Sequence, residues 1–176
     1  IIRGAAFLKR TKPVRYNPFS AIISFFTILE TRYKSLYLLG GHKNTLIESE
    51  RNLKATFPGL HIVGRYTGYF PKDMEKDVLS AIFKANPSMV LLADGIPSGV
   101  TWSYARRNSF GSSIFVYYKD ALSIFSKRKK RVSNETFDAG CEIWAEIAAN
   151  PLKIFLVFPY IWYILLLIGY RLFKNK

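Results

Sequence analysis

The chain has 176 residues, a length that suits one domain with a single core. Its 26 Lys and Arg against 12 Asp and Glu give a formal net charge of +14, and its 49% of hydrophobic residues excludes a disordered basic tail. The charge predicts attraction to a polyanion, either nucleic acid or an anionic membrane. With one cysteine, Cys141, and two histidines, no internal disulfide, thiolate metal cluster or histidine-based metal site is expected. The chemistry should be metal-free or else rely on carboxylates, and no cofactor is expected. Because the chain starts at Ile1 without an initiator Met, it is expected to lack its N-terminal part.

A helix is predicted first, over Phe19 to Tyr33 after Asn17-Pro18. Short, nearly continuous apolar runs then predict buried parallel strands at Ser35–Leu39, Leu60–Val63, Met89–Ala93 and Ile114–Tyr118. Between the strands, helical spacing places two groups of residues on helix faces: Leu46, Ile47, Leu53 and Phe57 from about Lys43, and Met74, Val78, Leu79, Ile82 and Phe83 after Pro71. The alternation of strands and helices predicts an α/β fold with a parallel sheet.

The C-terminal part of the chain is unusually apolar. A helix is expected over Asn134 to Ala149, stopping near Pro151. From Ile154 to Tyr170 there are then 17 residues without a charge, which is the lower limit for spanning a hydrocarbon core of about 30 Å. Apolar residues cover every side of this segment, so contact with lipid is favoured, with a buried core helix as the alternative. We expect a domain over residues 1–150 and a membrane-associated appendage over residues 151–176.

Five consecutive basic residues, Lys127 to Arg131, precede this part of the chain. Such a run is compatible with a nucleic-acid patch or with a solvated loop. The apolar segment that follows it favours contact with anionic lipid.

Three loops follow predicted strands and contain glycine. They are Gly40-Gly41, Gly64 to Phe70, and Asp94-Gly95-Ile96-Pro97 with Trp102 shortly after. Ligands of open parallel sheets bind at the carboxyl ends of the strands, so the three loops are expected to share one crevice. Glycines there let the backbone approach a phosphate, although a tight turn explains them equally. Asp94 is the best carboxylate for base chemistry or hydroxyl binding, with helix capping as the alternative.

The order of these motifs resembles the WecG/TagA/CpsF family (glycosyltransferase family 26). The resemblance runs over nearly the whole chain and is carried by LLGG at 38–41, FPGLHIVGRYTGYF at 57–70, a strand with G-x-P and a nearby Trp, and Glu142 nine residues before Pro151. It implies a Rossmann-like domain, flanked by helices, with a C-terminal membrane-binding appendage. It also implies inverting, metal-independent transfer of an N-acetylmannosamine-type sugar from a UDP donor to a polyprenyl-diphosphate-linked sugar in cell-envelope polymer synthesis.

On this interpretation, the nucleotide-sugar crevice is lined by Gly40, Gly41, Gly64, Gly68, Tyr69, Gly95 and Pro97. Asp94 would bind a sugar hydroxyl or assist as a base, and Lys153 would meet the acceptor diphosphate. The expected partners are the UDP-sugar, the lipid-linked acceptor and the anionic cytoplasmic face of the cell membrane, with peripheral or monotopic attachment. Nucleic acid is not an expected partner, and oligomerisation is left open.

The chain also departs from the family pattern. Pro97-Ser98-Gly99-Val100 replaces the usual Pro-Lys-Gln-Glu, and Ser20 stands where an aspartate is usual, although Arg15 matches a family arginine. Glu146 replaces an arginine of the appendage, and the family's proposed catalytic aspartate would precede the chain. A catalytically inactive, membrane-associated scaffold is therefore the alternative, and a basic nucleic-acid-binding domain has only the charge in its favour.

Overall fold

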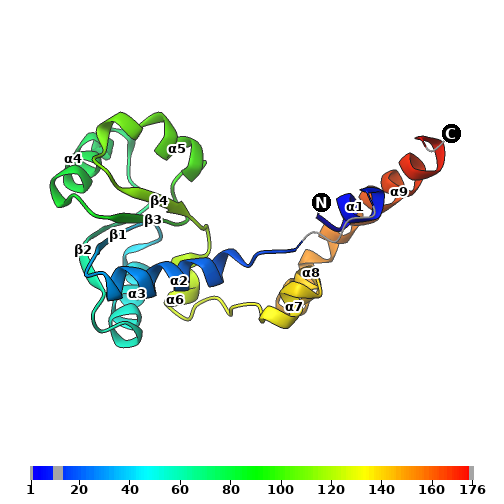
Figure 1. Ribbon diagram of the computed structural model, residues 1–176, viewed down its shortest axis with the longest axis horizontal. Coiled ribbons are helices and arrows are strands. Elements are labelled where there is room, and N and C mark those ends of the chain that lie inside the picture. The colour runs from blue at the N-terminus through cyan, green and yellow to red at the C-terminus, as the bar shows by residue number, and fades with distance from the viewer. Residues whose placement is uncertain (1, 10–13, 175–176) are drawn as a thin grey trace. The chain divides into compact units, whose positions relative to one another are not determined.

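A computed structural model describes residues 2–9 and 14–174 of the chain (Figure 1). The chain divides into two compact units: unit 1 comprises residues 1–17 and 132–176, and unit 2 comprises Pro18–Arg131.

Unit 2 is a parallel α/β sheet. Its elements are α2 (Pro18–Thr31), β1 (Ser35–Leu39), α3 (Lys43–Thr56), β2 (His61–Tyr66), η1 (Lys72–Met74), α4 (Glu75–Ala85), β3 (Met89–Leu92), α5 (Gly99–Ala105), η2 (Arg107–Ser109), β4 (Ile114–Tyr117) and α6 (Ala121–Phe125). The strand order is β2-β1-β3-β4, and all three pairings are parallel. The predicted fold class is confirmed. The short helices α5 and α6 lie outside the sequence prediction, which covers only the longer amphipathic helices.

Helices cover both faces of the sheet (Figure 1). Successive residues of a strand point to opposite faces, so Leu36 and Leu38 pack with α2, α3 and α6, whereas Tyr37 and Leu39 pack with α4 and α5. β1 and β3 are the central strands and, apart from the half-buried Ser35, are buried throughout, which explains their continuous apolar runs. Ile47, expected on the buried face of α3, is exposed.

β2 is longer than predicted. Leu36 pairs with Ile62 and Tyr37 with Gly64, so the register shifts at this point, and pairing then continues to Leu39 and Tyr66. The loop after this strand therefore begins at Thr67, three residues later than expected.

Unit 1 consists of helices. They are α1 (Ile2–Lys9), α7 (Asn134–Asp138), α8 (Glu142–Ala149), η3 (Pro151–Leu156) and α9 (Val157–Lys174). The single helix predicted over Asn134 to Ala149 is wrong: Gly140 has a φ of 66°, which breaks the helix between α7 and α8. The domain boundary expected after residue 150 falls inside this unit, between α8 and η3.

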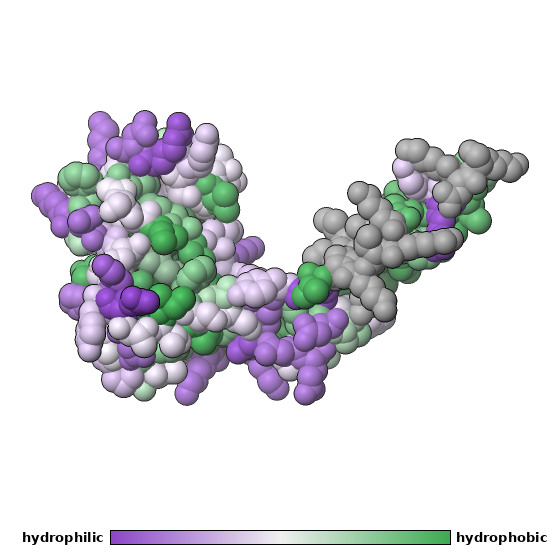
Figure 2. Space-filling view, viewed as in Figure 1, coloured by the Kyte–Doolittle hydropathy of each residue, from purple (hydrophilic) through white to green (hydrophobic). Residues whose placement is uncertain are grey.

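The C-terminal helical segment is apolar enough to be a candidate membrane span. Pro151–Phe173 covers 23 residues with a mean hydropathy of 2.1, and none of its most apolar window is buried. Figure 2 shows hydrophobic side chains on those parts of α9 that grey residues leave in view. Length and composition alone support this assignment, which makes the helix a weak sign of membrane association.

Candidate functional site

The loops after β1, β2 and β3 meet at the carboxyl edge of the sheet. The Gly41 N–H donates to the Asp94 carbonyl at 2.8 Å, and the Gly68 N–H donates to the Gly41 carbonyl at 3.0 Å. The Gly40 N–H donates to the Tyr66 carbonyl at 3.0 Å, which ties the first loop to the end of β2. Backbone hydrogen bonds thus hold Gly40, Gly41, Gly68 and Asp94 together.

Close backbone packing explains two of these glycines. A Cβ at Gly68 would lie 2.3 Å from the Asp94 carbonyl oxygen and 2.9 Å from the Gly40 Cα. Gly95, with a φ of 85°, lies against the Gly68 backbone and the Tyr69 ring. These residues build the loop cluster whether or not a ligand binds there.

Gly41 differs because a Cβ there would have room, with its nearest neighbour at 3.5 Å. Its φ of 64° lies in the left-handed region, which favours glycine. Gly41 leads directly to the N-terminus of α3, where His42 is the N-cap and makes no side-chain capping hydrogen bond. The first N–H groups of α3 can therefore serve an anion.

Asp94 lies inside the loop cluster. The Tyr69 hydroxyl donates to Asp94 Oδ2 at 3.0 Å, whereas Oδ1 is buried and has no hydrogen-bond partner in the described part of the chain. The hydrogen bond to Asp94 raises the pKa of Tyr69, because it stabilises the protonated phenol. The N-cap of α5 is Ser98, so Asp94 does not have the helix-capping role left open above.

His42 is a neighbour of this cluster that the sequence did not identify. Its ring stacks on that of Tyr69, with centroids 4.2 Å apart and an angle of 10° between the planes. The Tyr69 ring therefore has His42 against its face and Gly95 at its edge, while its hydroxyl bonds Asp94. The only sequence signal for His42 is its position between the Gly40-Gly41 turn and α3.

Gly64 and Pro97 were also expected to line the crevice, but they take no part in the hydrogen bonds described above. Gly64 lies within β2, where a Cβ would be 2.4 Å from the Tyr37 ring, so its expected place in a loop past the strand is wrong. Pro97 is exposed and leads into α5 through Ser98, whose φ is 47°. Gly99 packs under Tyr117, where a side chain would collide with the ring.

Trp102, expected near the third loop, is buried in the core. Its Nε1–H donates to Glu75 Oε1 at 2.6 Å, and Arg106 donates to Glu75 Oε2 at 2.9 Å. The Arg106 guanidinium lowers the pKa of Glu75. These contacts attach α5 to the start of α4.

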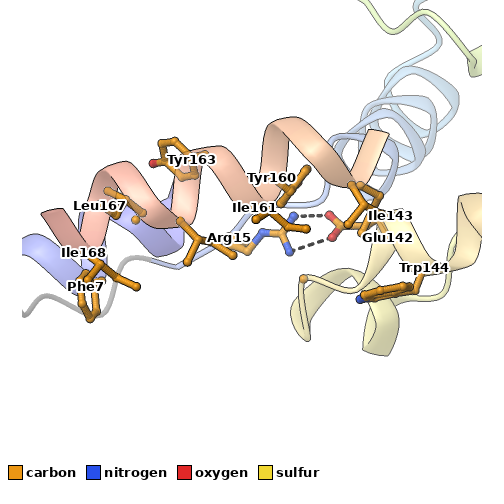
Figure 3. Close-up of a pocket in the computed structure, with 14 residues that line it drawn as sticks. Phe7, Arg15, Glu142, Ile143, Trp144, Tyr160, Ile161, Tyr163, Leu167 and Ile168 are labelled. Carbon is orange, nitrogen blue, oxygen red and sulfur yellow. Dashed lines mark hydrogen bonds and ion pairs between the residues drawn. The ribbon is translucent and has the colours of Figure 1, made fainter. Parts of the chain in front are cut away.

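Among the described residues of unit 1, two ion pairs involve α8. Arg15 forms a two-pronged pair with Glu142, one contact being 3.2 Å, and also donates to the Phe137 carbonyl (Figure 3). Glu142 raises the pKa of Arg15 above its ordinary value. One turn further along α8, Glu146 accepts a hydrogen bond from Lys153 at 3.0 Å. Lys153, the expected acceptor-binding residue, therefore has a carboxylate partner.

The basic run after α6 is largely engaged within unit 2. Arg128 pairs with Glu48, Lys129 pairs with Asp120 at 2.6 Å, and Arg131 lies over the Phe19 ring. Among the ion pairs formed by residues 2–9 and 14–174, none includes Lys127 or Lys130. No cluster of three or more His, Cys, Asp or Glu in these described ranges could hold a metal.

Comparison with known proteins shows the family to which the chain belongs. All residues, 1–176, match the sequence model of the glycosyl transferase WecG/TagA/CpsF family. A curated relative from Bacillus spizizenii is 26% identical over 124 residues, which cover 70% of this chain and 48% of the relative. A second, from Bacillus subtilis strain 168, is 22% identical over 136 residues, which cover 77% of this chain and 51% of the relative.

Both relatives are named N-acetylglucosaminyldiphosphoundecaprenol N-acetyl-beta-D-mannosaminyltransferase. The chain spans about half the length of these curated relatives. The family match, in contrast, covers all the elements described above, from α1 to α9. The chain therefore belongs to the WecG/TagA/CpsF family of glycosyltransferases.

Proposed function

We propose that this chain takes part in transfer of an N-acetylmannosamine-type sugar from a UDP donor to a polyprenyl-diphosphate-linked sugar. The observation that carries the proposal is the meeting of three glycine loops around Asp94, next to the N-terminus of α3. The family match and the names of both relatives point to the same reaction class. Cell-envelope polymer synthesis at the cytoplasmic face of the membrane is the corresponding cellular role.

The donor would bind at the carboxyl edge of the sheet. Its diphosphate would lie against the Gly40-Gly41 turn, where the N–H groups of α3 and the helix dipole favour negative charge. His42 and Tyr69 would provide ring surfaces beside the sugar or base. No metal is needed if the N–H groups and the dipole of α3 stabilise the negative charge of the diphosphate.

The transfer itself would be an inverting displacement. The acceptor hydroxyl attacks the anomeric carbon, the bond to the UDP oxygen breaks, and the hydroxyl proton passes to a base. Asp94 would bind a sugar hydroxyl or receive that proton. Tyr69 holds its carboxylate in place through the hydrogen bond to Oδ2.

The acceptor would bind to unit 1 through its diphosphate. Lys153 is the candidate cation, and a diphosphate carries more charge than the Glu146 carboxylate with which it now pairs. Glu146→Gln should therefore raise the affinity for undecaprenyl diphosphate, and Lys153→Ala should lower it. If neither substitution changes the affinity, Lys153 has no part in acceptor binding.

Donor binding can be tested by thermal unfolding with UDP-N-acetylmannosamine. A ligand that binds the native state raises the melting temperature by mass action, and Gly41→Val should remove that rise. Because valine at a φ of 64° also strains the fold, the quantity to compare is the ligand-induced increment of each variant. Gly59→Ala, at an exposed turn where the nearest neighbour is the Glu30 side chain, is the matched control. An increment that survives Gly41→Val would place the nucleotide elsewhere.

The second candidate function is a membrane-associated scaffold without transferase activity. It is favoured by the segment Pro97-Ser98-Gly99-Val100, which replaces the usual Pro-Lys-Gln-Glu of the family. Gly99 packs under Tyr117, and the segment contains no amide or carboxylate side chain to meet a donor. The same titration separates the two functions. No increment with any UDP-sugar would favour the scaffold.

A further inference from the structure

In unit 2, α2 packs one side on a face of the sheet and leaves its outer side exposed (Figure 1). Phe25 and Ile28 lie on this outer side and are 40% and 54% exposed. Helical spacing places Arg32 on the same line, one turn beyond Ile28. No charged residue occurs from Pro18 to Leu29. A helix side that faces water ordinarily carries charged residues, so the outer side of α2 has the composition of a contact surface.

The exposed hydroxyl groups of α2 are satisfied within the helix. Ser24, Thr27 and Thr31 are exposed, and each donates to the backbone carbonyl one turn earlier, at 2.7 to 3.2 Å. Their hydroxyl protons therefore do not depend on water. Removing water from this side of α2 would leave no hydroxyl donor unpaired, which lowers the cost of placing it against a less polar medium.

Tyr33, just after α2, has a backbone conformation that glycine adopts more easily. Its φ is 50°, in the left-handed region, where a side chain costs free energy. The Lys34 N–H donates to the Leu29 carbonyl at 2.8 Å, which closes the helix end around Tyr33. The Tyr33 ring is 89% exposed, so packing does little to offset this strain. An aromatic residue kept in a strained and exposed position indicates a contact outside the chain.

Charge at this end of α2 favours an anionic partner. Arg32 and Lys34 flank the tyrosine, and both are exposed. Among the ion pairs formed by residues 2–9 and 14–174, none includes Arg32 or Lys34. Glu30, the acidic residue of α2, accepts the Gly59 N–H at 2.7 Å. The surface thus combines an apolar stripe, an aromatic ring and two cations.

We propose that the outer side of α2, with Tyr33 and its two flanking cations, is a membrane-contact surface of unit 2. It lies among the headgroups of an anionic bilayer, with Phe25 and Ile28 at the boundary of the acyl chains. Helices that lie in the membrane interface have this combination of apolar stripe, aromatic residues and cations. The contact goes beyond the proposed function, because it serves an active transferase and a scaffold alike.

The size of the surface decides between a bilayer and a protein partner. A stable protein interface takes about 20–30 residues from each side, far more than the outer side of α2 offers. A bilayer needs no complementary shape and accepts a narrow stripe. Even a single acyl chain holds a protein on a membrane only marginally, so two half-exposed side chains do not replace α9 as the anchor. The contact instead determines which side of unit 2 faces the lipid.

Ile28 and Phe83 provide a matched test, because they are 54% and 60% exposed and lie on helices that cover opposite faces of the sheet. The 176-residue chain would carry a fluorophore on Ile28→Cys or Phe83→Cys, with Cys141→Ser to remove the native thiol. The protein would be bound to phosphatidylglycerol vesicles that contain a spin-labelled headgroup quencher. The fluorophore at 28 should be quenched and shifted to the blue, whereas the fluorophore at 83 should behave as in water.

Equal quenching at the two positions would overturn the proposal, and so would a protein that does not bind these vesicles. A fluorophore at 28 that is shielded from water but not quenched would assign the surface to a protein partner instead. On phosphatidylcholine vesicles the quenching at 28 should be weaker, because Arg32 and Lys34 lose their anionic partner. Equal quenching on both lipids would contradict the role of these cations.

Tyr33→Gly separates the membrane contact from the fold. Glycine suits a φ of 50°, so the variant should resist urea better than the parent, yet it should bind phosphatidylglycerol vesicles about twofold to threefold more weakly. Phe25→Ser should weaken binding about fivefold, because part of an aromatic side chain loses contact with lipid. Phe83→Ser is the control and should leave binding unchanged.

Unchanged binding of both Tyr33→Gly and Phe25→Ser would contradict the proposal. Circular dichroism checks that each variant is folded. None of these measurements requires a nucleotide or sugar transfer. A protein that fails the UDP-sugar titration can therefore still show quenching at 28, and a protein that binds UDP-sugar can fail to show it.

Discussion

Gly68 shows at the scale of one residue how the loop cluster is built. It lies where the Asp94 carbonyl, the Gly40 Cα and the Gly41 N–H come together, and the space for a Cβ is already taken by backbone atoms. Backbone cannot move aside as the end of a side chain can. The glycine is therefore a condition for the three loops to meet, separate from any contact that it makes with a ligand.

Gly68→Ala should consequently destabilise unit 2 by about 3 kcal/mol, because the loops must move apart. Urea unfolding followed by circular dichroism measures this loss. Gly59→Ala is the control, since its nearest neighbour is the flexible Glu30 side chain, and it should cost far less. A Gly68 variant as stable as the control would show that the loops are not packed as described.

Tyr69→Phe tests the contact with Asp94. Loss of the phenol hydroxyl should lower the free energy of unfolding by at most about 1 kcal/mol at neutral pH, because the bond is solvent-accessible. The pKa of Tyr69 is raised in the folded state, so the bond stabilises the protein below about pH 10 and this contribution is lost as the pH rises through the folded-state pKa. The gap between parent and variant should therefore close in alkaline urea titrations. Tyr104→Phe, at an exposed position, should show no such change.

At the scale of elements, α5 depends on one carboxylate of α4. Glu75 accepts hydrogen bonds from Trp102 and Arg106, and the Arg106 guanidinium also lies 5.0 Å from the Trp102 ring centroid. α5 has only seven residues, too few for stability by itself. Its position beside the third loop is thus set by tertiary contacts.

Glu75→Gln should cost about 1–2 kcal/mol at neutral pH, because it removes the charged pair with Arg106 but leaves an acceptor for Trp102. The pKa of Glu75 is lowered from 4.5, so its contribution is present above that pH and is lost as the pH falls through the folded-state pKa. The parent and variant should converge in acid when unfolding is followed by urea titration. Ser80→Ala, an exposed change on the same helix that involves no titratable group, should not show this convergence. A constant gap at all pH values would argue against the ion pair.

At the scale of the whole molecule, attachment to membranes should have two separable contributions. The apolar surface of α9 acts on any bilayer, and the basic run acts only on anionic lipid within a Debye length. The contribution of the basic run is reduced in the folded chain, because Glu48 and Asp120 already neutralise Arg128 and Lys129. Lys127 and Lys130 are left as the cations of the run that we expect to act on the membrane.

Replacing Lys127 and Lys130 with serine should weaken flotation on phosphatidylglycerol vesicles by about 1 kcal/mol per residue at low salt. Binding to phosphatidylcholine vesicles should not change. The matched control replaces Arg128 and Lys129 with serine and should reduce anionic binding less. Removal of residues 153–176 should abolish flotation on both kinds of vesicle. If the shortened chain floats as well as the parent, the terminal helix is not the anchor.

The sequence alone determined the sheet and the edge at which its loops gather. β1 and β3 are buried on both faces, and their continuous apolar runs made them predictable almost to the residue. Because helices were predicted in the connections between the first three strands, the parallel arrangement followed, and with it the meeting of the loops after β1, β2 and β3. Local signals were sufficient for these features.

Only the tertiary structure decided what individual side chains do. Arg15 and Glu142 are 127 residues apart, Arg128 and Glu48 are 80 apart, and no local pattern pairs them. Gly64 was assigned to a loop because its residue type suits one, whereas pairing with β1 extends the strand past it. Hydrogen-bonding partners and steric space are properties of neighbours distant in sequence. Periodicity therefore predicts where a strand or helix lies, and the folded chain determines which glycine packs and which charge is neutralised.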